Sequence, residues 1–211
     1  MPHPKPTLTL TLIASFLTAT AAFTAPNEIE LAKKAQGNGE FETLTSTDKD
    51  PVGEAGLWGF KAKVMVPNSC QEAFTALRDV ESYPKRMDKV KRVIILERKE
   101  KTMLADYTEG GMGIEVRSTI LWKFKDQPPM TILSENVGPE DPKTWMQTRF
   151  VEVGHPNYCE LNIRLFADTS IMPNFVMAWL TDITVEETAK AYRKLIAASV
   201  AEKQAVMPQK N

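Results

Sequence analysis

Six runs of strand-like sequence follow one another between residues 90 and 168, and one long helical pattern comes after them. Short turn-forming or polar segments separate the runs, which are Val90–Glu97, Lys101–Tyr107, Gly113–Phe124, Met130–Asn136, Trp145–Val153 and Tyr158–Asp168. Alternating runs with short separators predict antiparallel strands joined by tight connections. From Pro173 to about Lys203, apolar residues recur at spacings of mainly three and four. That pattern predicts one helix roughly three times the typical length.

A seventh strand and a short helix precede these runs. In residues 58–66 every second side chain is apolar, which is typical of a half-buried strand, and Pro67 ends the run. Asn68 or Ser69 can cap a following helix, and Glu72 completes a capping-box pattern with Ser69. The order of elements predicts an α+β fold in which a curved antiparallel sheet of about seven strands wraps around the long C-terminal helix. One helix cannot cover so many strands flatly, so we expect a cavity between them.

The N-terminal residues have the pattern of a secretion signal. An apolar, Thr-rich run from Leu8 to Phe23 follows Lys5, and Ala19-Thr20-Ala21 fits the small-x-small rule for cleavage. The run is shorter than the roughly 20 apolar residues that a spanning helix needs. We therefore predict a signal peptide over residues 1–22 and a secreted protein, periplasmic if the source is bacterial. An extension with a short helix and strand (23–56), a ligand-binding domain (57–203) and a disordered tail (204–211) follow.

Composition and motifs argue against several classes of function. The net charge is −1, whereas binding to nucleic acid needs a basic surface. Of the two histidines, His3 lies in the signal and His155 in a turn, so no Ser-His-Asp arrangement is available. Metal-ligand spacings such as HExxH and CxxC are absent, and no phosphate-binding loop is present. We predict no catalytic residue, no metal site and no cofactor.

The segment from Ala76 to Tyr107 resembles bacterial START-related domains, which have the helix-grip fold of the Bet v 1-like (SRPBCC) superfamily. The matching features are Leu77, Asp79, Tyr83 and Pro84 at the end of a helix, followed by Val90 and Leu96-Glu97-Arg98 on the next strand. A second match, from Ala167-Asp168 to Val176, resembles the start of the gripping helix. Arg86-Met87 stands where the family often has Trp, and Ser118 stands where it has Asp. The resemblance implies a buried site for a lipid, sterol or other apolar ligand.

Candidate ligand-binding residues are those whose strand or helix face should meet the cavity. The strand over residues 113–124 places its even-numbered apolar side chains on one face, and a face with Trp145, Gln147 and Arg149 mixes apolar and polar groups as pockets do. Arg117 and Arg149 are polar candidates for a head group, and a surface ion pair is the alternative for each. The candidates are Met112, Ile114, Val116, Arg117, Ile120, Trp122, Trp145, Arg149, Leu161, Ile163, Phe175, Trp179 and Ile183.

Cys70 and Cys159 are the two cysteines of the chain. In the fold that the resemblance implies, the first core strand pairs with the last, which brings the end of residues 58–66 near the start of residues 158–168. An exported protein meets an oxidising compartment, so a disulfide is allowed there. We predict a disulfide between Cys70 and Cys159, which requires their Cα atoms to lie within roughly 7 Å.

Three functions remain open at this stage. The first is an exported lipid carrier that takes up its ligand through movement of the gripping helix or of the loops at Gly110–Met112 and Gly138–Lys143. The second is an aromatase/cyclase-type enzyme in which a pocket Arg, Tyr107 or Glu115 acts on a polyketide or steroid. The third is an interaction module with a filled core. We expect a monomer whose partners are a hydrophobic small molecule or lipid and, transiently, a membrane, but not nucleic acid.

Overall fold

The computed structural model describes residues 27–111, 114–141, 143–168 and 174–206, with only the backbone at 111, 114, 174–185 and 206. In this part of the chain an eight-stranded sheet accompanies four α-helices and a short 3-10 turn at Val80–Ser82. The helices are α1 (Glu28–Gln36), α2 (Cys70–Arg78), α3 (Tyr83–Arg86) and α4 (Asn174–Val206). The strands are β1 (Glu40–Thr45), β2 (Trp58–Val66), β3 (Val90–Arg98), β4 (Thr102–Gly111), β5 (Ile114–Lys125), β6 (Thr131–Asn136), β7 (Thr144–Glu152) and β8 (Cys159–Ala167).

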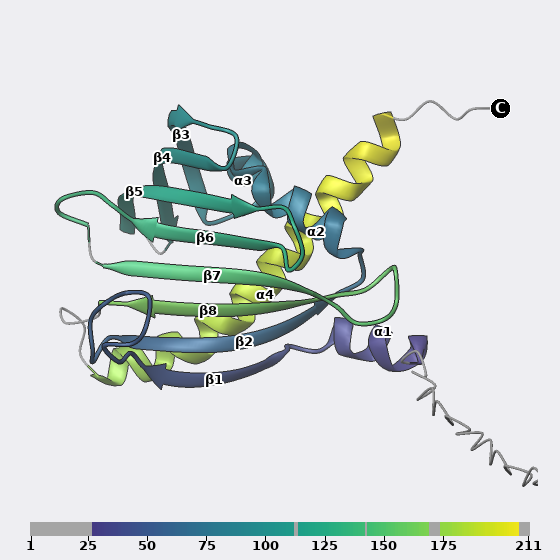
Figure 1. Cartoon of the computed structure of the whole chain (residues 1–211), viewed down its shortest axis with the longest axis horizontal. Coiled ribbons are helices and arrows are strands. Elements are labelled where there is room, and N and C mark those ends of the chain that lie inside the picture. Colours follow the sequence, from purple (N-terminus) through teal and green to yellow (C-terminus); the bar gives the residue numbers. More distant parts are fainter. Residues whose placement is uncertain (1–26, 112–113, 142, 169–173, 207–211) are drawn as a thin grey trace, which may run out of the picture.

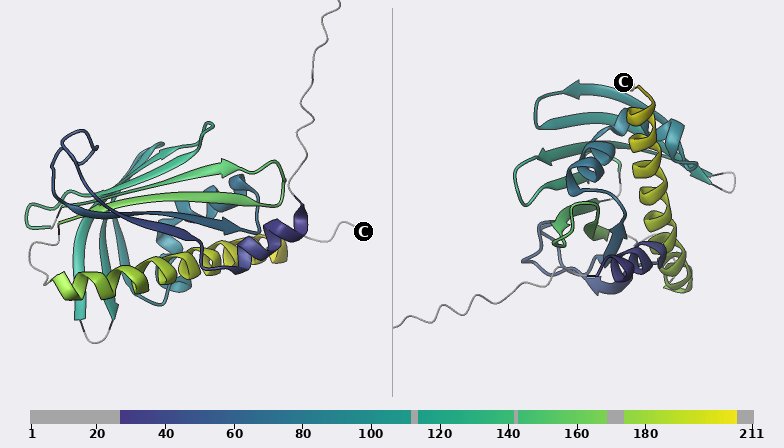
Figure 2. Two further views of the ribbon diagram at one scale, coloured as in Figure 1. Left: turned by 90° about the horizontal axis from the view of Figure 1, so that it is seen from below. Right: turned by 90° about the vertical axis from the view of Figure 1, so that its right-hand side faces the viewer.

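The strands lie in the order β1-β2-β8-β7-β6-β5-β4-β3, and every pair is antiparallel (Figure 1). Strands β3 to β5 turn out of the plane of β1, β2 and β8 toward the side on which α4 lies (Figure 2). The predicted curved sheet around a long C-terminal helix is therefore confirmed. The sheet gains an eighth strand because β1, from the expected extension, pairs with β2. Helix α4 continues to Val206, past the expected start of the tail.

Alternation along the strands divides the sheet into a concave face toward α4 and an outer face. On β2 the buried Phe60, Val64 and Val66 face α4, whereas Lys61 and Lys63 point outward. Because side chains alternate along a strand and paired residues share a face, the registers extend this division across all eight strands.

Helix α2 closes one end of the concave face. The Ser69 hydroxyl accepts a hydrogen bond from the Glu72 backbone N–H, and the Glu72 carboxylate accepts one from the Ser69 N–H (3.0 Å), so the predicted capping box forms. The Phe74 ring of α2 packs edge-on against Phe150 of β7 at 5.4 Å between centroids. Cys70, the first residue of α2, is bonded to Cys159, the first of β8, with their Cα atoms 4.9 Å apart. This disulfide joins α2 to the sheet.

The outer face is covered at two places. Leu31 and Ala35 of α1 pack on Met65 of β2. The loop over residues 46–57 lies at the other end, where Asp50 pairs with Arg164 of β8. A backbone hydrogen bond from Thr47 and the Arg164 guanidinium hold the pKa of the Asp50 carboxyl below its usual range.

Beneath that loop, aromatic side chains form a second apolar layer on the outer face. The Arg164 guanidinium stacks over the Phe166 ring at 4.8 Å, and Trp145 lies beside Phe166 at 6.1 Å between centroids. Only glycine fits at position 59, since a Cβ there would lie 2.4 Å from the Leu165 carbonyl oxygen and 2.5 Å from the Phe166 ring. The outer side of β2, β7 and β8 is thus buried at this end.

Ion pairs hold α4 from Glu187 to Glu202, mostly in its C-terminal half, against α3 and the segment that joins α3 to β3. Lys194 pairs with Asp88 at 2.9 Å, and Glu187 pairs with Lys89. Arg86 contacts Glu202 at 2.5 Å. Each of these pairs is exposed on at least one side and contributes little alone, but together they fix the position of this half of the helix. No helix in the described ranges is long and apolar enough to cross a membrane.

Candidate functional site

The concave face of the sheet is packed shut at one end and only half buried at the other. At the α2 end, side chains from four neighbouring strands are buried in the core, namely Val66, Leu161, Phe150 and Ile132. Toward the other end of the sheet, on β2, β8, β7 and β5, the concave-facing side chains are half buried and pack against the edge of that core, namely Trp58, Leu165, Met146 and Ile120. We call this second set, together with Tyr107, Glu109 and Val116, the open end.

The N-terminal half of α4 crosses the sheet at the open end (Figures 1 and 2). Even so, Val116, which faces the same side as Ile120, keeps 47% of its surface exposed. Full burial of a side chain such as valine or leucine stabilises a protein by about 1.5–3 kcal/mol, so a set of half-exposed apolar groups under a helix is unfavourable unless something else covers it. The open end is therefore the part of the concave face with unsatisfied apolar surface.

The polar side chains that face α4 beside the open-end residues are Ser118, Asn136, Thr144 and Glu109. The carboxyl of Glu109 faces the same side as Tyr107 and Val116 and has no hydrogen-bond or ion-pair partner in the described part of the chain. Burial raises the pKa of this carboxyl, and the nearby Lys89 ammonium opposes that shift in part. Although many protein atoms surround Glu109, its side chain stays accessible to solvent, as expected for a group that faces an incompletely filled space.

Three tyrosines in or beside the core are held as neutral phenols. Burial raises the pKa of Tyr83 well above its usual range. It also raises the pKa of Tyr107 and of Tyr192. The Tyr83 hydroxyl donates to the Leu77 carbonyl oxygen at 2.6 Å, and the Tyr192 hydroxyl lies 3.7 Å from the Met146 sulfur. These hydroxyls can donate hydrogen bonds, but they are poor general bases at neutral pH.

The structure divides the predicted ligand-binding residues into four groups. Ile120 and Val116 lie at the open end. Trp122, Leu161 and Ile163 also face α4, but at 4%, 0% and 2% exposure they are sealed in the core. Met112 lies outside the described residues, and only the backbone is described for Ile114, Phe175, Trp179 and Ile183.

Three predicted site residues lie on the opposite face of the sheet. Arg117 pairs across the strands with Thr108, Trp145 with Phe166, and Arg149 with Asn162. Their neighbours Ser118, Met146 and Phe150 are the ones that face α4, because adjacent side chains on a strand point to opposite sides. Trp145 is buried, at 5% exposure, but by the second layer on the outer face and not by the cavity. Placing these three in the pocket was wrong.

Trp58, Met146, Leu165, Tyr107 and Glu109 are open-end residues that the list of candidates omits. The sequence contained a signal for Trp58 and Leu165, because both alternate in phase with residues predicted to face the helix. The sequence signal for Tyr107 and Glu109 was weaker, because β4 continues to Gly111, beyond the predicted end of this strand at Tyr107.

The loop from Gly138 to Lys143, expected as a gate, is tied to the sheet and to the outer-face loop. The Asp141 carboxylate accepts a hydrogen bond from the Thr119 N–H at 2.7 Å. Lys143 pairs with Glu54, and its carbonyl oxygen accepts from the Asp168 N–H at 2.7 Å. The other expected gate is the loop at Gly110–Met112, and Met112 lies outside the described residues.

The groups invoked for catalysis do not converge. Tyr107 faces α4, whereas Glu115 and Arg117 lie on the outer face of β5. Within the described residues, no three His, Cys, Asp or Glu side chains gather closely enough to hold a metal ion. A hollow of about 550 Å³ lies on the outer side of β3–β5, and another of about 250 Å³ lies beside α2. No described α4 residue lines either of them.

Comparison with solved structures identifies the architecture. The STAR-related lipid transfer protein of Xanthomonas axonopodis superposes with a TM-score of 0.57 at 12% identity, over 74% of this chain and 93% of that one. Human STARD10 gives a TM-score of 0.63 at 10% identity, over 86% and 84%. This chain has the START-related helix-grip fold. The aromatase/cyclase Zhui of Streptomyces sp. R1128 also has this fold, with a TM-score of 0.57 at 11% identity over 82% and 99%.

The START-related fold is thus shared by lipid-transfer proteins and by cyclases, and identities near one-tenth establish the fold alone. No family model matches the sequence, and no curated protein does. Function has to be argued from the open end of the concave face.

Proposed function

We propose that this chain is a carrier that holds an apolar ligand, such as a lipid, sterol or isoprenoid, between the open end of the sheet and the N-terminal half of α4. The observation that carries the proposal is the half-exposed apolar side chains on a face that a helix crosses, with Val116 at 47% exposure. Ligand sites for apolar molecules are mostly apolar and have a few polar groups that fix orientation. The apolar lining would consist of Trp58, Ile120, Met146 and Leu165. The polar groups would be Glu109 and Tyr107.

The anchoring of α4 supports a route for ligand entry. From Glu187 onward the helix is tied by ion pairs through Glu187, Lys194 and Glu202, and the expected gate at Gly138–Lys143 is held in place. We propose that the ligand enters by movement of the part of the helix that precedes Glu187. We expect the ends of α4 to differ in hydrogen exchange, with faster exchange N-terminal to Glu187 in the ligand-free protein.

A cyclase-type enzyme is the second candidate, and it depends on Glu109. A carboxyl whose pKa is raised by burial beside a neutral Tyr107 is the kind of pair that can exchange a proton with a bound substrate. The residues first considered for this role, Arg117 and Glu115, lie on the wrong face of the sheet. The enzyme is distinguished from the carrier by turnover of a bound polyketide or steroid that is lost in Glu109→Gln.

We also propose that the protein is exported. Two features support this: the apolar run from Leu8 to Phe23 and the disulfide between Cys70 and Cys159, a bond that persists in oxidising compartments. N-terminal sequencing of protein from the periplasm or medium tests it. A mature chain that begins near residue 23 supports export, and a full-length chain in the cytoplasm contradicts it.

A matched pair of substitutions on β5 tests the carrier. Ile120→Trp adds bulk at the open end, and Leu121→Trp adds the same bulk on the outer face of the same strand. Native mass spectrometry of freshly purified protein should detect a co-purifying lipid in the wild type and in Leu121→Trp, and little or none in Ile120→Trp. Both variants should keep the wild-type circular dichroism spectrum.

Two outcomes would contradict the carrier. If Ile120→Trp retains the lipid as well as Leu121→Trp does, the open end is not the site. If no lipid is found in any variant and the open-end amides exchange as slowly as the core, the interaction module with a filled core is the better account.

A further inference from the structure

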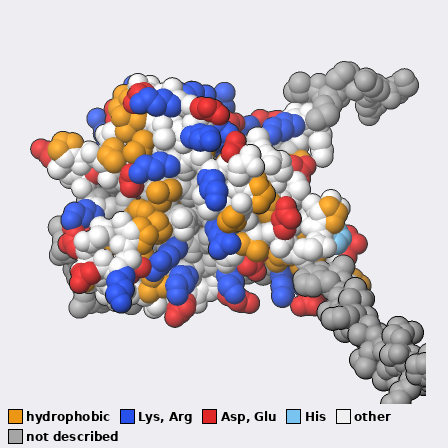
Figure 3. Space-filling view, in the orientation of Figure 1, with side chains coloured by type: hydrophobic (Ala, Val, Ile, Leu, Met, Phe, Trp, Pro, Cys, Tyr) orange, Lys and Arg blue, Asp and Glu red, His pale blue; other side chains and the backbone are white. Residues whose placement is uncertain are grey.

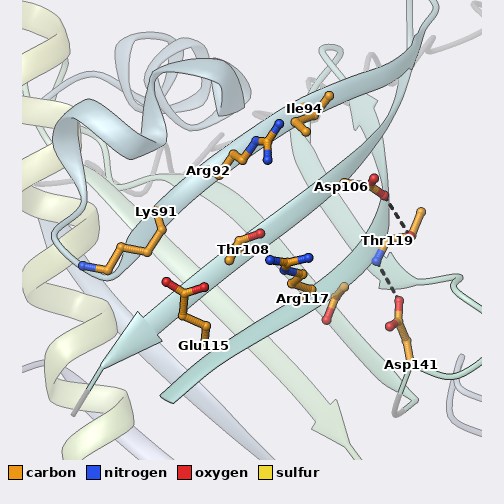
Figure 4. Close-up of a pocket in the computed structure, with 10 residues that line it drawn as sticks. Lys91, Arg92, Ile94, Asp106, Thr108, Glu115, Arg117, Thr119 and Asp141 are labelled. Atoms are coloured by element: carbon orange, nitrogen blue, oxygen red, sulfur yellow. Dashed lines mark hydrogen bonds between the residues drawn. The ribbon is translucent and has the colours of Figure 1, made fainter. Parts of the chain in front are cut away.

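The outer face of β3, β4 and β5 holds a hollow of about 550 Å³ that the carrier function does not use (Figure 4). It lies on the opposite side of the sheet from α4, because its residues Arg92, Thr108 and Arg117 alternate with the concave-facing Val93, Tyr107 and Val116. Neither α1 nor the loop over residues 46–57 contributes to its lining. The hollow is therefore a separate candidate site.

Two arginines and a threonine form one row across the floor of this hollow. Arg92 of β3 is paired with Thr108 of β4, and Thr108 is paired with Arg117 of β5. Neighbouring strands lie about 4.8 Å apart, so the backbones that carry the two arginines are about 10 Å apart with the threonine between them. Arginine side chains reach far enough to contact one bound group from both sides. In Figure 4 the Arg117 guanidinium lies beside Thr108.

The arginines have no partner in the described residues, whereas two of the three acids of the lining, Asp106 and Asp141, are hydrogen-bonded to Thr119. In the described part of the chain, neither Arg92 nor Arg117 forms an ion pair or a hydrogen bond. Asp106 instead accepts a hydrogen bond from the Thr119 hydroxyl at 3.0 Å, and Asp141 accepts one from the Thr119 N–H at 2.7 Å. Thr119 thus holds both carboxylates in the row next to the arginines (Figure 4).

We propose that this hollow binds a single oxyanion group, a phosphate or carboxylate, with Arg92 and Arg117 donating from its two sides and the Thr108 hydroxyl from below. Guanidinium groups match the geometry of such anions with two parallel hydrogen bonds, and these charge-assisted bonds are stronger than neutral ones. The group belongs to a ligand different from the one held under α4.

The charges around the hollow restrict which anion fits. Lys91 and the two arginines are balanced by Asp106, Asp141 and Glu115, so the lining carries no net charge. Figure 3, which views this side of the sheet, likewise shows basic, acidic and apolar side chains interspersed. A long polyanion such as nucleic acid would meet the carboxylates as well as the arginines. One compact anionic group placed on the arginine row avoids them.

Arg149 provides a matched control because it is an exposed arginine on the same outer face, has no partner in the described residues, and lies outside the hollow. Amide NMR spectra of the wild type are titrated with inorganic phosphate at constant ionic strength. We expect shifts at Arg92, Thr108 and Arg117, an affinity about tenfold or more lower in Arg117→Ala and in Arg92→Ala, and no change in Arg149→Ala. Thr108→Val, which keeps the side-chain shape, should weaken binding less.

A second arm identifies the source of the anion. Co-sedimentation with phosphatidylglycerol vesicles that is lost in Arg117→Ala but kept in Arg149→Ala identifies a lipid head group; phosphate binding without vesicle binding identifies a soluble anion. The proposal is overturned if neither probe binds, or if Arg149→Ala weakens binding as much as Arg117→Ala, because net charge alone then explains the effect. Lipid retention in Arg117→Ala should be unchanged, so failure here leaves the carrier under α4 unaffected.

Discussion

The two ends of the concave face are built from the same strands but differ in how they are covered. At the closed end, α2, the disulfide and the C-terminal half of α4 converge on Val66, Leu161 and Phe150, which are almost fully buried. At the open end, the same strands present Trp58, Leu165 and Met146 to the crossing N-terminal half of α4 and leave them half buried. The difference separates the part of the fold that supplies stability from the part available for a ligand.

This separation has a structural cause. The sheet curves around one long helix, which does not fill the whole concave face, and α2 fills the remaining space at the closed end. No described helix does the same at the open end. A ligand under the N-terminal half of α4 would take the place that α2 takes at the closed end.

Loss of the disulfide at the closed end should have the largest effect. The bond closes a loop across a sequence separation of 89, and restricting a loop of that length in the unfolded chain stabilises the fold by about 4–5 kcal/mol in the chain-entropy model. We expect Cys70→Ser with Cys159→Ser to lower the free energy of unfolding in urea by about that amount. A loss below about 1 kcal/mol would show that the closed end does not depend on this bond.

Leucine-to-alanine substitutions on β8 compare the two ends directly. Leu161 and Leu165 share the strand and the concave face, but Leu161 has 0% of its surface exposed and Leu165 is half buried. Leu161→Ala should cost about 3 kcal/mol because it leaves a cavity in a packed core, and Leu165→Ala about 1 kcal/mol. Chemical denaturation measures both. Equal costs would mean that the open end is packed as tightly as the closed end.

The sequence was sufficient for the fold and for one face of β5. The alternation from Val116 to Trp122 had a single phase, and the structure places those residues toward α4 as expected. The resemblance implied that the first core strand pairs with the last and brings Cys70 near Cys159, and the structure shows both.

Strand β7 shows why the rest of the site was not predictable. Its two faces carry Trp145 and Phe150 respectively, and both are buried, because the loop over residues 46–57 covers the outer face while α2 covers the concave one. A strand buried on both sides loses the alternation that identifies its inner face. The arginines add to the difficulty, because the sequence alone allows both a head-group ligand in a pocket and a surface ion pair for Arg117 and for Arg149.

The smallest effect that we expect concerns Glu109, the unpaired carboxyl of the open end. Burial raises the pKa of this group above its usual value of 4.5, so between that value and the raised one the folded state binds more protons than the unfolded state. Stability from this group is therefore complete at low pH and is lost as the pH rises through the raised pKa. Compared with Glu109→Gln, the wild type should lose thermal stability between about pH 4.5 and neutrality, by a few degrees at most because the side chain remains accessible.

Glu115→Gln removes the same charge from the outer face of β5 and serves as the control. A bound apolar ligand should steepen the difference, because it excludes water from Glu109; if the wild type and Glu109→Gln follow the same pH profile with and without ligand, Glu109 does not face the ligand, and the open end must be redrawn without β4.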